Sequence, residues 1–300
     1  MTHQVGLFGL RVQSDFTLPD WPAQSAPGPA DLRIIRGSLS GPLAGGPTYS
    51  VKSLVEDREL LLGVSGVGRY KASGGNLITV DPDPEARAED VLLYLTGVVL
   101  AAILHQRGIL PLHASCVARD GMAIALAGTS GAGKSTLLAA LVGSGWTFVS
   151  DDICVLAARP EGGFGVWPSL PRAKLDESAL AIVAQPKPER ESAGGNRGKF
   201  ILPLGSASRL TEPTRLGVVY LLQEGNGTPR FERLEGLEAV SALVAETYYL
   251  AHAAALGLAN LCFTQAASLA RDVQVLRLIR PRGFEHLPSV VALLEAAGRD

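Results

Sequence analysis

The segment Gly128-Thr-Ser-Gly-Ala-Gly-Lys134-Ser135 has the residue types and spacing of a loop that binds phosphate. In the pattern G-x-x-x-x-G-K-[ST], backbone N–H groups cradle phosphates, the lysine reaches the β and γ phosphates, and the serine hydroxyl can ligate Mg²⁺. An apolar run precedes the loop and a helix-like run follows it, which places the N-terminus of a helix on the anion. The pattern predicts that ATP and Mg²⁺ bind to Gly128, Thr129, Ser130, Gly131, Ala132, Gly133, Lys134, Ser135 and Thr136.

Two adjacent carboxylates, Asp151 and Asp152, follow the short apolar run Trp146–Val149. In a right-handed β-α-β unit this strand runs parallel to the one that feeds the phosphate loop, so both strands end at the same edge of the sheet. Neighbouring residues on a strand point to opposite faces. One aspartate can therefore face the acceptor of a phosphoryl group while the other holds a metal or the loop. A bare Asp-Asp pair at a solvated strand end is the simpler alternative.

A histidine is expected beside this group. Residues 110–117 and 122–127 read as two strands joined by a turn at Asp120-Gly121, so that residues whose numbers add to about 241 face each other. His113 then lies opposite Ala127 or Gly128, at the mouth of the loop. Next to an aspartate and a phosphate, a histidine can orient groups or handle protons. A histidine that merely satisfies its hydrogen bonds in the core is the alternative.

Three segments together resemble the catalytic domain of HPr kinase/phosphorylase: Leu112-His113-Ala-Ser-Cys-Val, the glycine loop, and Gly145-Trp-Thr-Phe-Val-Ser-Asp-Asp152. That family phosphorylates a serine hydroxyl on a carrier protein, and its core resembles that of phosphoenolpyruvate carboxykinase. The resemblance implies an α/β fold with a P-loop kinase domain. It also implies that Asp151 acts as the base with His113 against it and that Ser135 binds Mg²⁺. Lys134 then acts on the transferred group, and Asp152 is expected to serve as a metal ligand.

The sequence departs from that family after the aspartates, because the glutamate-containing Arg-Gly-rich signature is missing. In its place stand residues 168–175 and 198–203. These segments and the opening Gly9–Pro19 are similar to HPr-kinase-related serine kinases encoded beside ribosomal-peptide genes. Those of lasso-peptide pathways phosphorylate the C-terminal serine of a precursor. This similarity makes three cations candidates for holding triphosphate or substrate charge, with an ordinary surface role as the alternative: Arg172, Lys174 and Lys199.

The length of 300 residues suggests one or two domains. Residues 1–84 alternate short apolar runs with turns, which predicts a small β-rich N-terminal domain for substrate recognition or assembly. Asp81–Pro84 favours a boundary there, since Pro suits the start of a helix. Residues 85–300 then form the kinase domain. It is expected to contain helices over 85–105, 176–183, 237–250 and 289–297, strands over 218–222 and 273–278, and a mobile loop over 185–198.

The composition argues against several classes of protein. A net charge of −2 without a basic cluster argues against a nucleic-acid partner. The most apolar run, Val91–Leu104, is too short to span a bilayer and predicts a buried helix, so neither a membrane nor a signal peptide is expected. Cys116, Cys154 and Cys262 are far apart in the chain and match neither a disulfide framework nor a metal motif. These features favour a cytoplasmic protein and leave a homo-oligomer open.

Three functions fit these patterns. The first is an ATP- and Mg²⁺-dependent kinase acting on a serine of a peptide or protein partner, with the C-terminal serine of a lasso-type precursor as the specific expectation. The second is a small-molecule kinase on the same scaffold. The third is a nucleotide-switched binding module without catalysis. Such switches usually carry an Asp-x-x-Gly element or a nucleobase-reading motif on later strands, and neither is found in the sequence.

Overall fold

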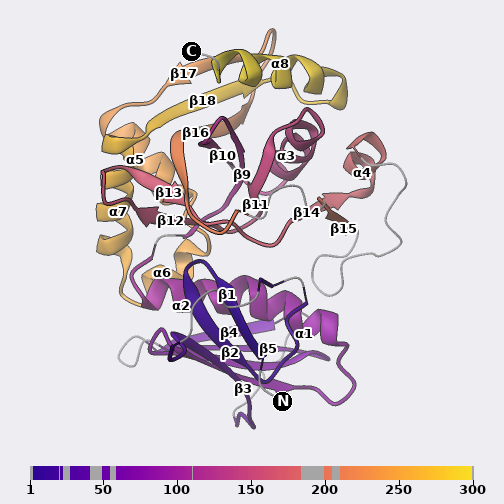
Figure 1. Cartoon of the computed structure of the whole chain (residues 1–300), viewed down its shortest axis with the longest axis vertical. Helices are drawn as coiled ribbons and strands as arrows, with labels where there is room; N and C mark the ends of the chain where they lie inside the picture. Colours follow the sequence, from indigo (N-terminus) through magenta and orange to yellow (C-terminus); the bar gives the residue numbers. More distant parts are fainter. Residues whose placement is uncertain are drawn as a thin grey trace. The chain divides into compact units, whose positions relative to one another are not determined.

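The computed structural model describes residues 3–19, 21–22, 28–40, 49–54, 59–109, 111–183, 199–204 and 210–298. It is a mixed α/β fold whose chain divides into two compact units (Figure 1). Unit 1 consists of Met1–Pro111, Ala193–Asn196 and Tyr249–Cys262, and unit 2 consists of Leu112–Ser192, Arg197–Tyr248 and Phe263–Asp300.

Unit 1 contains a seven-stranded sheet with the strand order β1-β2-β3-β7-β6-β5-β4. The expected β-rich character of this region is confirmed. The apolar run over 5–12 forms two strands rather than one, because Phe8 and Gly9 both have positive φ, 52° and 75°, and turn the chain back. The strands are β1 (His3–Leu7), β2 (Leu10–Ser14), β3 (Leu32–Arg36), β4 (Tyr49–Leu54), β5 (Glu59–Val64), β6 (Gly68–Ser73) and β7 (Leu77–Pro82).

The apolar helix that follows packs on this sheet. It runs through α1 (Ala88–Tyr94), a wider π-type segment η1 (Leu95–Val99) and α2 (Leu100–Gln106). The Tyr70 hydroxyl donates a 3.1 Å hydrogen bond to Val91 O, and the Gln106 amide bridges Ala72 O and Gly75 N at 3.0 and 2.8 Å. These contacts assign the helix to unit 1, whereas the sequence placed the domain boundary before it, at residue 84.

By length and composition this helix could also cross a membrane, since Ala88–Gln106 spans 19 residues with a mean hydropathy of 1.6. Inside the chain, 56% of its apolar window is buried. All seven residues of α2 are buried. The helix therefore packs as the core helix that the sequence predicted, and its apolar character follows from that position.

Unit 2 is built on a nine-stranded sheet that includes the path β11-β9-β10-β16-β13-β12-β8, with β18 pairing β16 and β17 pairing β18. β10, β16 and β18 run parallel to one another, so their carboxyl ends share one edge. The strands are β8 (Pro111–Leu112), β9 (Ala114–Arg119), β10 (Met122–Ala127), β11 (Thr147–Ser150), β12 (Cys154–Ala158), β13 (Phe164–Val166), β16 (Thr214–Glu224), β17 (Arg230–Arg233) and β18 (Gln274–Arg280).

A separate two-stranded ladder, β14 (Arg172–Asp176) with β15 (Lys199–Pro203), and several helices complete the fold. The helix expected over 237–250 ends at Ala245, because Thr247 pairs with Leu112 instead, and the positive φ of Tyr249, 54°, separates this helix from the next. The helix α7, the ladder and β13 and β17 were not predicted. The helices are α3 (Lys134–Gly143), α4 (Glu177–Val183), α5 (Gly236–Ala245), α6 (Leu250–Ala255), α7 (Ala259–Asp272) and α8 (Leu287–Ala297), with a short turn η3 (Phe284–His286).

The core of unit 2 fixes α3 at the sheet. Leu137 and Leu141 on α3 are buried together with Leu126 of β10, Leu278 of β18 and Leu294 of α8. Burying a leucine side chain contributes about 2 kcal/mol, so this contact holds the start of α3 at the carboxyl edge of β10.

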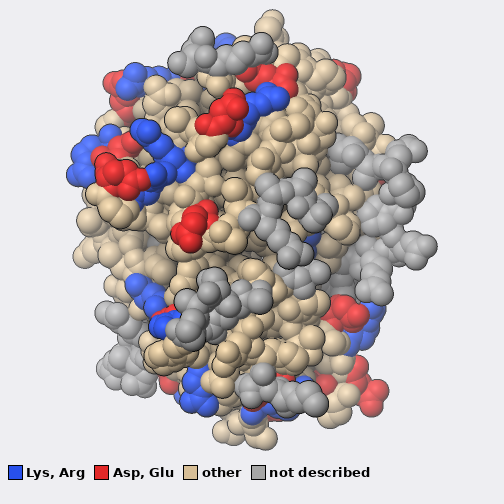
Figure 2. Space-filling model, in the orientation of Figure 1, with Lys and Arg blue, Asp and Glu red and all other residues tan. Residues whose placement is uncertain are grey.

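On the visible, described part of the surface, Lys and Arg are interspersed with Asp and Glu (Figure 2).

Candidate active site

The glycine loop lies between β10 and α3, as the sequence predicted. Gly131 and Gly133 both have a φ of 83°, a conformation that favours glycine, and Gly133 caps α3. Lys134 is only 6% exposed, and its Nζ donates to Gly128 O at 2.5 Å and Thr129 O at 3.1 Å. The Lys134 ammonium therefore contacts the backbone of the loop at the place where phosphates would be held.

The strand register confirms the expected place of His113. Ala114 faces Ala127 and Arg119 faces Met122, so the numbers of paired residues add to 241 as predicted. β11 pairs antiparallel with β9, which pairs antiparallel with β10, so β11 and β10 are parallel and end at the same edge. The loop, His113 and the aspartates therefore meet at one edge of unit 2.

Asp151 contacts the serine of the loop. Its Oδ1 accepts hydrogen bonds from Ser115 Oγ at 2.6 Å and Ser135 Oγ at 3.0 Å, and its Oδ2 accepts one from the backbone N of Lys174 at 3.2 Å. Burial raises the pKa of Asp151, and the neighbouring charge of Asp152 raises it further, against these hydrogen bonds. This carboxylate is thus partly buried and directed at the residue expected to bind Mg²⁺.

Asp152 has different neighbours. Lys174 Nζ lies 2.9 Å from its Oδ2, His113 Nδ1 lies 3.4 Å from its Oδ1, and the Tyr248 hydroxyl lies 3.4 Å from Oδ2. Burial acts to raise the pKa of Asp152, but the Lys174 ammonium and the hydrogen bonds from His113 and Lys174 outweigh it and hold the pKa well below normal. Asp152 is therefore ionised over the physiological range.

The contact of the histidine differs from the expectation. The resemblance placed His113 against Asp151, whereas His113 lies against Asp152, and its Nδ1 is also 3.2 Å from Asp152 O. The reason is local, because β11 ends at Ser150 and Asp152 has a φ of 73°. The strand alternation that separated the two aspartates does not extend to them. The left-handed turn instead gives each carboxylate its own set of partners.

Lys174 connects the two carboxylates, with its backbone N on Asp151 and its Nζ on Asp152. Strand alternation in β14 explains its orientation, because Ala173 and Leu175 are buried in the core. Arg172 begins the same strand, two residues away. Lys199 lies opposite Asp176, at the other end of the ladder, and its side chain is outside the described residues, as are residues 185–198.

Three further residues of the site were missed by the sequence analysis. Glu246 Oε2 accepts a hydrogen bond from Gly128 N at 3.0 Å, and Glu246 O accepts one from His113 N at 2.7 Å. The Tyr248 ring packs 5.5 Å from the His113 ring, centre to centre. Ser115 lies within the segment Leu112–Val117, and nothing in that segment distinguishes it as a site residue. The pairing of Leu112 with Thr247 brings Glu246 and Tyr248 here, and no local motif signals it.

The residues fit a Mg²⁺–nucleotide complex. Within the described part of the chain, no three His, Cys, Asp or Glu side chains gather into a metal site. Mg²⁺ commonly uses one or two protein oxygens together with phosphates and water. The Ser135 hydroxyl and the Asp151 carboxylate supply such oxygens beside the loop.

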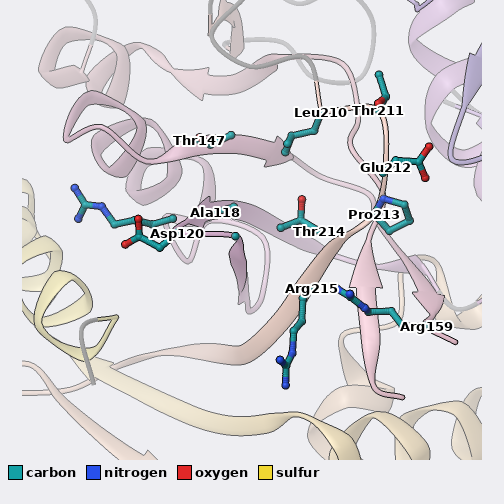
Figure 3. A pocket seen from close by; sticks show the side chains of 12 residues that line it. Ala118, Asp120, Thr147, Arg159, Leu210, Thr211, Glu212, Pro213, Thr214 and Arg215 are labelled. Carbon is teal, nitrogen blue, oxygen red and sulfur yellow. The ribbon is translucent and has the colours of Figure 1, made fainter. Parts of the chain in front are cut away.

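Two other features lie apart from this chemistry. The Sγ atoms of Cys116 and Cys154 are 3.2 Å apart, so these residues are neighbours in space although separated in sequence, and both are free and buried. An open cavity of about 440 Å³ lies at the opposite edge of the sheet, where β10, β11 and β16 begin (Figure 3). Its lining includes Thr147, Arg159 and Arg215.

Comparisons with known proteins are distant. Residues 80–177 match the family described as "SynChlorMet cassette protein ScmC". No curated protein matches the chain. Among solved structures, the HPr(Ser) kinase/phosphatase from Coxiella burnetii is similar over 63% of this chain and 88% of its own, with 13% identity and a TM-score of 0.31. The function is therefore inferred from the site itself.

Proposed function

We propose that this chain is a kinase that transfers the γ-phosphoryl group of ATP, with Mg²⁺, to a serine hydroxyl of a peptide or protein. The observation that supports this proposal most is that the two adjacent carboxylates contact different groups. Asp151 is bonded to Ser135 of the phosphate loop, and Asp152 to His113 and Lys174. Phosphoryl transfer needs one group of each kind, one to hold the metal and one to accept the proton of the nucleophile.

On the metal side, Ser135 and Asp151 would hold Mg²⁺, which neutralises charge on the β and γ phosphates. Lys134 would supply a further positive charge at those phosphates. This assignment reverses the roles that the resemblance implied for the aspartates. It follows from the contact between Ser135 and Asp151.

On the acceptor side, Asp152 would accept the proton of the serine hydroxyl while the serine oxygen attacks the γ phosphorus. The bond from γ phosphorus to the β–γ bridging oxygen breaks, and ADP leaves. Lys174 and His113 orient the Asp152 carboxylate and keep it ionised. A carboxylate with a low pKa suits this role because transfer in a loose transition state needs little basicity until late.

The acceptor itself is proposed from the sequence segments around Arg172 and Lys174, which resemble serine kinases of ribosomal-peptide pathways. We infer a peptide serine near a chain terminus, with the C-terminal serine of a lasso-type precursor as the specific candidate. A small-molecule kinase and a nucleotide switch remain the rivals. A peptide substrate, action in the cytoplasm and a role of unit 1 in recognition or assembly all belong to this proposal.

The test is an incubation of the full chain with labelled ATP, Mg²⁺ and precursor peptides, read by mass spectrometry. We expect a mass gain of one phosphate on the wild-type peptide and none when its terminal serine is replaced by alanine. Phosphorylation of free serine, sugars or nucleosides without peptide turnover would favour the small-molecule kinase. ATP binding without transfer to any acceptor would favour the switch.

A further inference from the structure

The guanidinium of Arg280 lacks the anionic partner that its position calls for. Arg280 is partly buried, and its Nε is a buried nitrogen without a hydrogen-bond partner in the described structure. Its other nitrogens meet backbone carbonyls, with Nη2 on Ala132 O and Nη1 3.5 Å from Pro281 O. Desolvated charges in proteins are normally paired with an opposite charge, because leaving one unpaired costs several kcal/mol.

The neighbouring carboxylate of Glu224 is paired with a different arginine, Arg282. Glu224 is the strand partner of Arg280 in the register of β16 and β18. Its Oε2 lies 3.8 Å from Arg282 Nη1, and within the described residues Arg280 forms no ion pair. Burial lowers the pKa of Arg280 against a smaller opposing effect of Glu224, although a guanidinium stays protonated at neutral pH.

The sheet places this cation at the phosphate loop. β18 runs parallel to β16 and β16 parallel to β10, so Arg280 ends β18 at the edge where β10 enters the loop. The side chain reaches the loop itself, since a Cβ added to Gly133 would lie 2.7 Å from Arg280 Nη2. The backbone N–H groups of such a loop bind phosphate.

We propose that Arg280 binds a phosphate of the nucleotide held by the glycine loop. It thereby acts as a catalytic arginine supplied by the same chain, and a planar guanidinium can make two parallel hydrogen bonds to a phosphate. This inference rests on the proposed function, because it names a further residue of the same nucleotide site. Arginines of this kind raise phosphoryl-transfer rates by about 10³- to 10⁵-fold in other nucleotide-hydrolysing enzymes.

The contact with Ala132 O suggests a rival role, in which Arg280 only supports the loop. Arg280→Gln removes the charge, and the salt dependence of ATP binding separates the two roles, because loss of a loop contact alone leaves that dependence unchanged. Arg282→Gln is the matched control, since Arg282 is 81% exposed, lies two residues away and meets Glu224 at 3.8 Å. Calorimetric binding of Mg·ATP to each full-length variant measures the effect, with melting curves to show that each is folded.

We expect Arg280→Gln to weaken Mg·ATP binding by about tenfold to a hundredfold, the range for losing charge-assisted hydrogen bonds. Raising the salt concentration should weaken ATP binding to the wild type more than to this variant. Arg282→Gln should bind ATP within about threefold of the wild type, as expected for an exposed pair. Wild-type affinity in folded Arg280→Gln, with an unchanged salt dependence, would overturn the inference.

Arg280→Lys tests the inference if the glutamine variant does not fold. It keeps the charge without the planar fork, so ATP should bind about threefold to tenfold more weakly than to the wild type. ATP affinity and salt dependence unchanged from the wild type in a folded Arg280→Lys protein would overturn the inference. A wild-type chain that does not bind ATP at all would instead refute the proposed function, and the two failures are thereby distinguishable.

Discussion

The Ser135 hydroxyl donates a 3.0 Å hydrogen bond to Asp151 Oδ1, across a separation of 16 residues in the sequence. This bond joins the end of β11 to the first turn of α3. Asp151 therefore contacts the loop serine, while Asp152 contacts His113 and Lys174. The two aspartates should therefore respond differently to the same substitution.

For the metal side, Asp151→Asn is expected to raise the Mg²⁺ concentration that gives half-maximal transfer by about tenfold or more, because one metal oxygen loses its charge. Ser135→Ala should shift the Mg²⁺ dependence in the same direction. Titration of activity with Mg²⁺ at saturating ATP measures both. An unchanged Mg²⁺ requirement in both variants would contradict this assignment.

For the acceptor side, Asp152→Asn should still bind Mg·ATP but lose transfer by about 10²- to 10⁴-fold, the usual contribution of a positioned base. Asn also tolerates the left-handed backbone at this position. Separate measurement of ATP affinity and single-turnover rate checks the prediction. If Asp151→Asn lost transfer at any Mg²⁺ concentration and Asp152→Asn did not, the roles implied by the resemblance would be correct.

Lys134→Ala should lower the rate of phosphoryl transfer by about two to three orders of magnitude, because it removes a buried cation from the β and γ phosphates. Steady-state transfer with ATP and a peptide acceptor measures the loss. Lys71→Ala is a suitable control, since Lys71 pairs with Glu59 in the sheet of unit 1. Near-normal turnover by Lys134→Ala would refute the assignment of the loop.

The raised pKa of Asp151 predicts how stability changes with pH. A carboxyl whose pKa is higher in the folded state stabilises the protein below its unfolded pKa of about 3.9, and this contribution is lost as pH rises through the folded value. Asp151→Asn carries no such charge. The melting temperature of Asp151→Asn relative to the wild type should therefore increase as the pH rises above about 4.

Melting curves of both proteins in buffers of matched ionic strength measure this difference. Asp120→Asn is an appropriate control, because Asp120 is an exposed residue of the turn between β9 and β10, and asparagine tolerates its positive φ of 52°. Its difference from the wild type should not follow the same trend. A pH-independent difference for Asp151→Asn would show that burial does not raise this pKa.

The sequence alone predicted those parts of the site whose positions depend on short-range rules. The turn at Asp120-Gly121 predicted the register that places His113 beside the loop, and the β-α-β rule predicted the edge where Asp151 lies. These inferences depend on chain connectivity and on hydrogen-bond patterns that few residues specify. The sequence therefore brought the main groups of the site to one place.

The finer geometry depended on contacts that no local pattern encodes. The left-handed φ of Asp152 exchanges the neighbours of the two aspartates, and aspartate tolerates that conformation without signalling it. Glu246 and Tyr248 reach the site through a single bridge between Leu112 and Thr247. Arg280 is the last residue of β18, and its contact with Ala132 O, not a sequence motif, places it at the loop.

Unit 1 is assembled from separated stretches of the chain, Met1–Pro111, Ala193–Asn196 and Tyr249–Cys262. Within it, α6 contacts both α2 and β4. A single recombination breakpoint therefore cannot transfer unit 1 to another enzyme. Deletion of residues 1–84 would remove the sheet that packs against the apolar helix Ala88–Gln106 and would expose that helix. Under the proposed role of unit 1 in recognition, a change of substrate should then arise by point substitutions on unit 1, and exchange of residues 1–84 alone should yield insoluble chimaeras.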